Sequence, residues 1–97
     1  MKIEMKDILI SIQRALLEKI TPNLRSVCVI LDNSCIKLVF YFNSPPNEEE
    51  KELVSLADTE FISDFHPPEY KTLCEIIAIP FPNKIPDEGF CVFSRYE

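Results

Sequence analysis

The side chains that could do chemistry are one histidine, four cysteines and a large group of carboxylates. A hydrolase or nuclease needs an acid, a base or a metal ion held in a pocket. His66, the only histidine, lies next to two prolines, in a loop position where histidine is usually solvated. Two carboxylate pairs have i, i+4 spacing, Glu48 with Glu52 and Glu60 with Asp64, but on an exposed helix such pairs usually form a solvated face. No catalytic motif is present, so we expect a protein without enzymatic activity.

The cysteines and the glycine content point away from cofactors. No Cys-x-x-Cys occurs, and the histidine is far from any cysteine pair, which disfavours a zinc site. A cytosolic chain with its own core does not need disulfides, so we expect free thiols, with two disulfides or a zinc site as alternatives. Gly89 is the only glycine, and phosphate-binding loops need at least two. We therefore expect no cofactor and no metal. The cysteines are Cys28, Cys35, Cys74 and Cys91.

The carboxylates are concentrated in one segment. Residues 44–69 contain eight acidic residues and one basic residue, Lys51, in a chain whose net charge is −6 at pH 7. Such a field attracts cationic surfaces and repels nucleic acid. We therefore expect a basic protein partner and no binding to nucleic acid. The acidic residues of the segment are Glu48, Glu49, Glu50, Glu52, Asp58, Glu60, Asp64 and Glu69.

Length and composition fit one globular domain over residues 1–97. The chain is 46% hydrophobic and 27% charged, which argues against disorder. No apolar run approaches the roughly 20 residues that cross a bilayer. The first seven residues contain acids where a signal peptide has a basic start. These observations predict a cytoplasmic protein that does not bind membranes.

Two amphipathic helices are expected to position the acidic segment. In residues 5–20 apolar side chains recur every three or four positions, and Pro22 is expected to end the helix. The second helix is expected to start after Ser44 as its cap, with glutamates in its first turn, and to end at Pro67. Its predicted apolar stripe is Leu53, Leu56, Ala57, Phe61 and Phe65.

Four β-rich runs complete the pattern. Residues 25–32 and 35–43 alternate in hydropathy around a short polar turn, which predicts a hairpin, and residues 73–79 and 90–96 predict two further strands. We therefore predict an α+β fold in the order α-β-β-α-β-β, with two helices on one face of a four-stranded, mainly antiparallel sheet. The expected buried residues include Leu16, Val29, Phe40, Leu56 and Phe61.

Two surfaces are candidates for binding a partner. The first is the acidic helix and the residues after it. The second is the sheet face away from the helices, which is either partly covered by residues 80–86 or serves as an interface, for example in a homodimer. The first surface comprises Glu49, Glu52, Asp58, Glu60, Asp64, Glu69 and Tyr70, and the second comprises Ile30, Val39, Tyr41 and Phe93.

Four strings connect the chain to a known group of proteins. They are TPNLRSV at residues 21–27, IKLVFYF at 36–42, TEFISDF at 59–65 and PDEG at 86–89. With these strings the chain resembles small acidic bacterial immunity proteins of contact-dependent growth inhibition and related polymorphic toxin systems. None of the strings is a site signature, and the group has no catalytic residues to carry over.

The resemblance implies a binding function. Many toxins of these systems are nucleases, whose substrate clefts are basic, and an acidic protein can occupy such a cleft as a phosphate mimic. The resemblance therefore implies an immunity protein that neutralises a cognate toxin, a ribonuclease or other nuclease, by blocking its basic cleft. Two alternatives remain at this point: a non-catalytic interaction or dimerisation module of the same fold, and a small enzyme.

Overall fold

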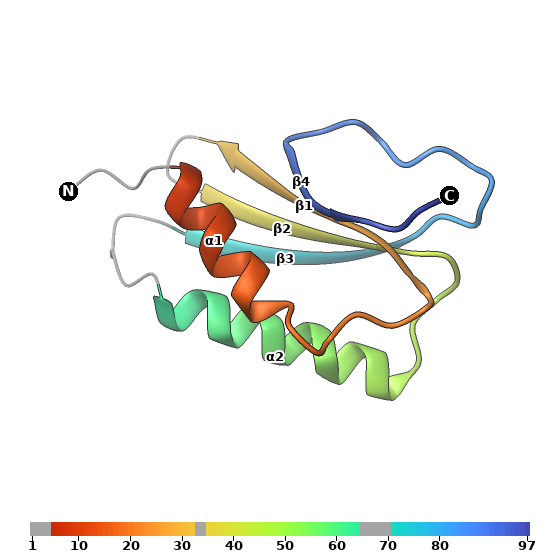
Figure 1. Ribbon diagram of the computed structural model, residues 1–97, viewed down its shortest axis with the longest axis horizontal. Helices are drawn as coiled ribbons and strands as arrows, with labels where there is room; N and C mark the ends of the chain where they lie inside the picture. The colour runs from red at the N-terminus through yellow and green to blue at the C-terminus, as the bar shows by residue number, and fades with distance from the viewer. Residues whose placement is uncertain (1–4, 33–34, 65–70) are drawn as a thin grey trace.

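The computed structural model describes residues 5–32, 35–64 and 71–97. Its elements follow the predicted order of helix, strand, strand, helix, strand, strand (Figure 1). The α+β class, with two helices and one four-stranded sheet, is therefore confirmed. The elements are α1 (Met5–Ala15), β1 (Leu24–Asp32), β2 (Cys35–Phe42), α2 (Glu48–Asp64), β3 (Lys71–Ala78) and β4 (Phe90–Ser94).

The sheet is mixed. Its strand order is β3-β2-β1-β4, and β1 is antiparallel to both of its neighbours, β2 and β4. In contrast, β3 runs parallel to β2, so two strand pairs are antiparallel as predicted and one is parallel. The reason is the connection, because α2 runs back along the sheet from the end of β2 to the start of β3 (Figure 1). A helical crossover of this kind is the usual way to join parallel neighbours.

Both helices contribute to one core on one face of the sheet. Apolar side chains of α1 and α2 pack there with alternate residues of β1 and β2, as the hydropathy pattern predicts. Leu16, Val29, Phe40 and Phe61 are buried as expected. The buried core residues are Ile8, Ile12, Ala15, Leu16, Leu24, Val27, Val29, Ile36, Leu38, Phe40, Phe42, Val54, Ala57 and Phe61.

The buried stripe of α2 is rotated relative to the predicted one. Glu50, Val54, Ala57 and Phe61 are buried at steps of four, three and four residues, while Leu56 is 48% exposed. The prediction that Leu56 is buried is therefore wrong. Glu50 occupies a buried position that a hydropathy pattern assigns to an apolar residue. The buried side of α2 is therefore rotated away from Leu56.

Helix α1 ends earlier than predicted. It stops at Ala15, so Pro22 does not terminate it. Glu18 has a φ of 64°, in the left-handed region that commonly ends a helix. Because the chain changes direction there, Leu16 stays buried, whereas Ile20 is 48% exposed.

The second sheet face is covered by the connector, residues 79–89, between β3 and β4. Tyr41 and Val39 are each 2% exposed and belong to a small apolar cluster against which Ile85 of the connector packs. The connector therefore covers the part of this face around Tyr41 and Val39, and the homodimer considered above stays a prediction. Phe93 packs against the helix-side core instead, where a register shift between β1 and β4 marks a bulge.

Arg25 fixes the connector to the sheet. Its guanidinium, on a side chain that is 3% exposed, donates to Oε2 and Oε1 of Glu97 at 2.6 and 2.7 Å. It also donates to the carbonyl oxygens of Ile79 at 2.7 Å and Asn83 at 2.9 Å, and it lies 5.6 Å from the ring centre of Phe81. The hydrogen bond from Arg25 lowers the pKa of Glu97 to about 2. We call the pair of Arg25 and Glu97, with the carbonyl oxygens that Arg25 binds, the clamp. Its two charges are paired with each other inside the fold.

Gly89 occupies the point where the connector enters β4. Its φ is +66°, and a Cβ there would collide with the carbonyl oxygen of Val29 and lie 2.9 Å from Cγ1 of Ile30. Only glycine combines that backbone conformation with so close an approach. The single glycine of the chain is therefore needed for the backbone path of the connector.

Candidate functional site

Helix α2 begins with a capping box. Oδ1 of Asn47 accepts a hydrogen bond from the backbone N–H of Glu50 at 2.8 Å, and Oε1 of Glu50 accepts one from the N–H of Asn47 at 3.0 Å. Ser44, the predicted cap, instead donates from its N–H and its hydroxyl to Oδ1 of Asn23, both at 3.0 Å. The cap is therefore three residues later than predicted, and it fixes which side of α2 faces the core.

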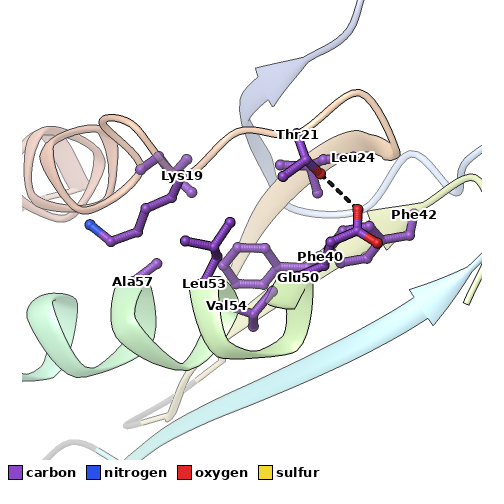
Figure 2. Close-up of a pocket in the computed structure, with 10 residues that line it drawn as sticks. Lys19, Thr21, Leu24, Phe40, Phe42, Glu50, Leu53, Val54 and Ala57 are labelled. Carbon is purple, nitrogen blue, oxygen red and sulfur yellow. Dashed lines mark hydrogen bonds between the residues drawn. The ribbon is translucent and has the colours of Figure 1, made fainter. Parts of the chain in front are cut away.

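Glu50 is an internal carboxylate. It is 9% exposed, and its Oε2 accepts a hydrogen bond from Oγ1 of Thr21 at 2.8 Å (Figure 2). Nδ2 of Asn23 donates to its Oε1 at 3.4 Å. Burial raises the pKa of Glu50, but hydrogen bonds from Asn47, Thr21 and Asn23 outweigh burial and leave the pKa below its ordinary value. Glu50 therefore joins α2 to the segment before β1 and is not presented to a partner.

The cavity beside Glu50 is too small for a ligand. Figure 2 shows it between the end of α1, α2 and the sheet, with Lys19, Thr21 and Glu50 among mainly apolar side chains. Its volume is about 10 Å³, close to the minimum for one water molecule. Within the described ranges, no group of three or more His, Cys, Asp or Glu side chains could hold a metal ion.

Glu60 forms an ion pair inside the molecule. Nζ of Lys19 lies 3.1 Å from Oε2 of Glu60 and also donates to the carbonyl oxygen of Ala15 at 2.8 Å. The pair joins the end of α1 to α2. The side chain of Glu60 remains 55% exposed, so it still contributes to the surface field while its charge is partly neutralised.

Asp58 is half-buried, whereas it was expected on the solvent face. Its Oδ1 is buried and has no hydrogen-bond partner among the described residues. Burial raises the pKa of Asp58. Burial, and then the negative charge of Asp58, raise the pKa of the Cys74 thiol on β3 to about 12. The carboxylate of Asp58 is therefore close enough to β3 to influence the Cys74 thiol.

The exposed acids are at the start of α2. Glu48 is 95% exposed, with Lys51 at 3.5 Å. Glu49 and Glu52 are exposed, and neither has an ion pair within the described part of the chain. Leu56 follows one turn after Glu52. Positions 49, 52 and 56 share one side of a helix, so we call Glu49, Glu52 and Leu56 the α2 stripe.

The residues predicted from the sequence to bind a partner thus fall into different environments in the structure. It brings Glu49 and Glu52 together and gives Glu60 an internal partner. The side chain of Asp64, and both Glu69 and Tyr70, lie outside the described residues, as does His66. Leu56 is the exposed residue that hydropathy missed. The spacing of Asn47 and Glu50 fits a capping box, which would place Glu50 on the inner side of α2. That signal in the sequence could have placed Leu56 on the outer side.

The site is therefore an acidic surface on a scaffold whose described helices are all too short or too polar to span a membrane. Comparison with family models places the chain among immunity proteins, which confirms the resemblance noted from the sequence. The matching family is the MafI2 immunity protein family, and the match covers residues 5–97. The chain belongs to this family, which implies a cognate toxin as its partner. A search of curated proteins found no match.

Proposed function

We propose that this protein neutralises a nuclease toxin in the bacterial cytoplasm by covering the toxin's basic cleft with the α2 stripe. Family membership supports the existence of a toxin partner. The nature of that toxin and the binding surface are the proposed part. Inhibition of this kind needs no catalytic group on the inhibitor, only carboxylates and an apolar anchor held by a rigid scaffold.

The observation that carries the proposal is the division of the carboxylates on α2. Glu50 and Glu60 have partners inside the fold, whereas Glu49 and Glu52 are exposed without an ion pair. Carboxylates of the second kind can meet cationic side chains without first losing an internal contact. The α2 stripe is therefore the part of the acidic segment best suited to contact a basic surface.

The two kinds of side chain in the stripe have different roles in this proposal. Glu49 and Glu52 steer the toxin and increase the association rate, as charges at an interface rim do. Leu56, which is 48% exposed in the free protein, becomes buried in the complex and slows dissociation. We propose that Asp64, Glu69 and Tyr70 also contact the toxin, and that Asp58 and Glu60 contribute to the field around the stripe.

Binding kinetics with the toxin domain encoded beside the gene test the proposal. Glu49→Gln/Glu52→Gln should slow association by about tenfold at low salt and should reduce the salt dependence of the rate. Leu56→Ala should mainly speed dissociation. The matched control is Asp87→Asn/Glu88→Gln, which removes the same charge from exposed positions on the connector.

The comparison of the two double variants decides the outcome. A tenfold effect of the α2 variant and no effect of the connector variant would support the stripe. Equal rates and equal salt slopes for the two variants would overturn the assignment of the surface. A toxin domain that binds normally but has no nuclease activity would overturn the toxin class alone.

A further inference from the structure

Two cysteines face each other across β1 and β4. Cys28 of β1 and Cys91 of β4 are direct partners in the antiparallel register. Directly opposed residues of an antiparallel pair project from the same face of a sheet. The face is the one covered by the connector, because Cys28 belongs to the apolar cluster of Val39 and Tyr41.

The two thiols meet at one hydroxyl. Oγ of Ser26 lies 3.7 Å from Sγ of Cys28 and 3.6 Å from Sγ of Cys91. The same hydroxyl donates to the carbonyl oxygen of Phe93 at 3.0 Å, and Cys91 donates to that oxygen at 3.1 Å. These contacts hold both sulfur atoms in the space between the two strands.

The pair is asymmetric in its exposure. Cys91 is exposed, whereas Cys28 is 5% exposed. Burial raises the pKa of the Cys28 thiol, and the neighbouring Cys91 raises it further. An attacking reagent in solution can therefore reach Cys91 first, while Cys28 is protected from direct attack but stays next to Cys91.

The backbone geometry permits a bond between them. Opposed Cα atoms in antiparallel strands are about 4.5 to 5.5 Å apart. Disulfides form across Cα separations of about 4.4 to 6.8 Å. The other two cysteines lack such a partner, since Cys35 is opposite Lys71 and Cys74 is opposite Leu38.

We propose that Cys91 and Cys28 form a dithiol site that reacts with small-molecule disulfides such as oxidised glutathione. The thiolate of Cys91 attacks one sulfur of the reagent, the reagent's S–S bond breaks, and one glutathione leaves as a thiolate that takes up a proton. Cys28 then loses its proton and attacks the Cys91 sulfur, which releases the second glutathione. The two protein thiols are oxidised to a disulfide, and one oxidised glutathione is reduced to two thiols.

The product has a defined structural effect. The bond ties β4 directly to β1 and encloses β2, α2, β3 and the connector in one covalent loop. The α2 stripe lies on the opposite side of the sheet from this pair. The dithiol site is therefore independent of the proposed toxin surface, and either proposal can fail without the other.

The test is thiol counting after exposure of the folded protein to oxidised glutathione. Unreacted thiols are then blocked with iodoacetamide in denaturant and counted by mass spectrometry. The parent chain should go from four free thiols to two, without bound glutathione, and peptide mapping should find Cys28 joined to Cys91. Cys28→Ser should stop at a mixed disulfide between Cys91 and glutathione.

The matched control is the double variant Cys35→Ser/Cys74→Ser. It should close the same disulfide at the same rate, because it keeps the facing pair. The proposal is overturned if the parent keeps four thiols, if glutathione stays attached to Cys91 in the parent, or if the bond joins any other pair. A disulfide that forms equally in the Cys28→Ser variant would also overturn it.

Discussion

The helices cover one face of the sheet with a large set of apolar side chains, whereas the connector covers the other face with a small cluster and a set of hydrogen bonds. On the helix face, Phe61 and Phe40 are buried among aliphatic side chains from four elements. On the connector face, Tyr41 and Val39 are equally buried, but the segment over them is fixed by the guanidinium of Arg25.

This difference predicts how each face fails. Apolar packing is distributed over many contacts, so its loss should lower the stability of the whole domain. A clamp built on one side chain should fail locally, because the connector has few other buried groups. The helix face should therefore govern global unfolding, and the connector face should govern local opening.

Removing a core aromatic should have the largest effect. Phe61→Ala should lower the free energy of unfolding by about 3–5 kcal/mol, since a fully buried phenylalanine leaves a cavity. Phe81→Ala is the matched variant on the connector, where the ring is 54% exposed, and it should cost less than about 1 kcal/mol. Urea denaturation measures both, and equal losses would contradict the comparison.

Removing the clamp should have the next largest effect. Arg25→Met deletes four hydrogen bonds from a buried guanidinium and should cost about 2–3 kcal/mol. Hydrogen exchange should show faster exchange at Phe81 and Asn83 while α2 remains protected. Uniform loss of protection through α2 would show that the connector is not a separate unit of stability.

Acid should weaken the clamp selectively. The pKa of Glu97 is about 2 in the folded protein, below the ordinary 4.5, because Arg25 donates to it. A lowered pKa stabilises the fold above the ordinary value, and that contribution is lost as the pH falls from about 4.5 to about 2. Glu97→Gln should be less stable than the parent at pH 7, and the difference should vanish near pH 2. A difference that is independent of pH would contradict the prediction.

The smallest expected effect lies at the one buried polar atom of α2 without a partner among the described residues. Because burial raises the pKa of Asp58, its charged form destabilises the folded state at neutral pH. Asp58→Asn should therefore stabilise the protein at pH 7 by at most about 1 kcal/mol. The gain should shrink as the pH falls through the raised pKa towards 3.8, and thermal unfolding at several pH values would measure it.

Local patterns in the sequence predicted the elements and the helix-facing sides of β1 and β2. They could not predict the parallel pairing of β3 or the cover over Tyr41, because both depend on contacts between distant segments. Phe93 was assigned to the wrong face because a bulge changes the alternation in β4. In each case the sequence indicates correctly that the residue is apolar, but it does not indicate which residues pack against it.

The candidate site shows the same limit. The acidity of α2 is evident from composition, but which carboxylates are free is not. Glu50 accepts a hydrogen bond from Thr21, which is 29 residues away in sequence. Glu60 pairs with Lys19, which is 41 residues away. No pattern within α2 itself contains that information, so the structure was needed to separate Glu49 and Glu52 from the internal acids.

The capping box at Asn47 and Glu50 has a consequence for how such a protein can diversify. It orients α2 from the inside, so the outward positions at 49, 52 and 56 take no part in holding the helix in place. If the α2 stripe is the toxin-binding surface, as proposed above, substitutions there can alter recognition while the scaffold keeps its stability. On that proposal, a duplicated gene can acquire specificity for a different toxin by exchanging these few positions, and protection of one strain against another's toxin would depend on them rather than on overall sequence identity.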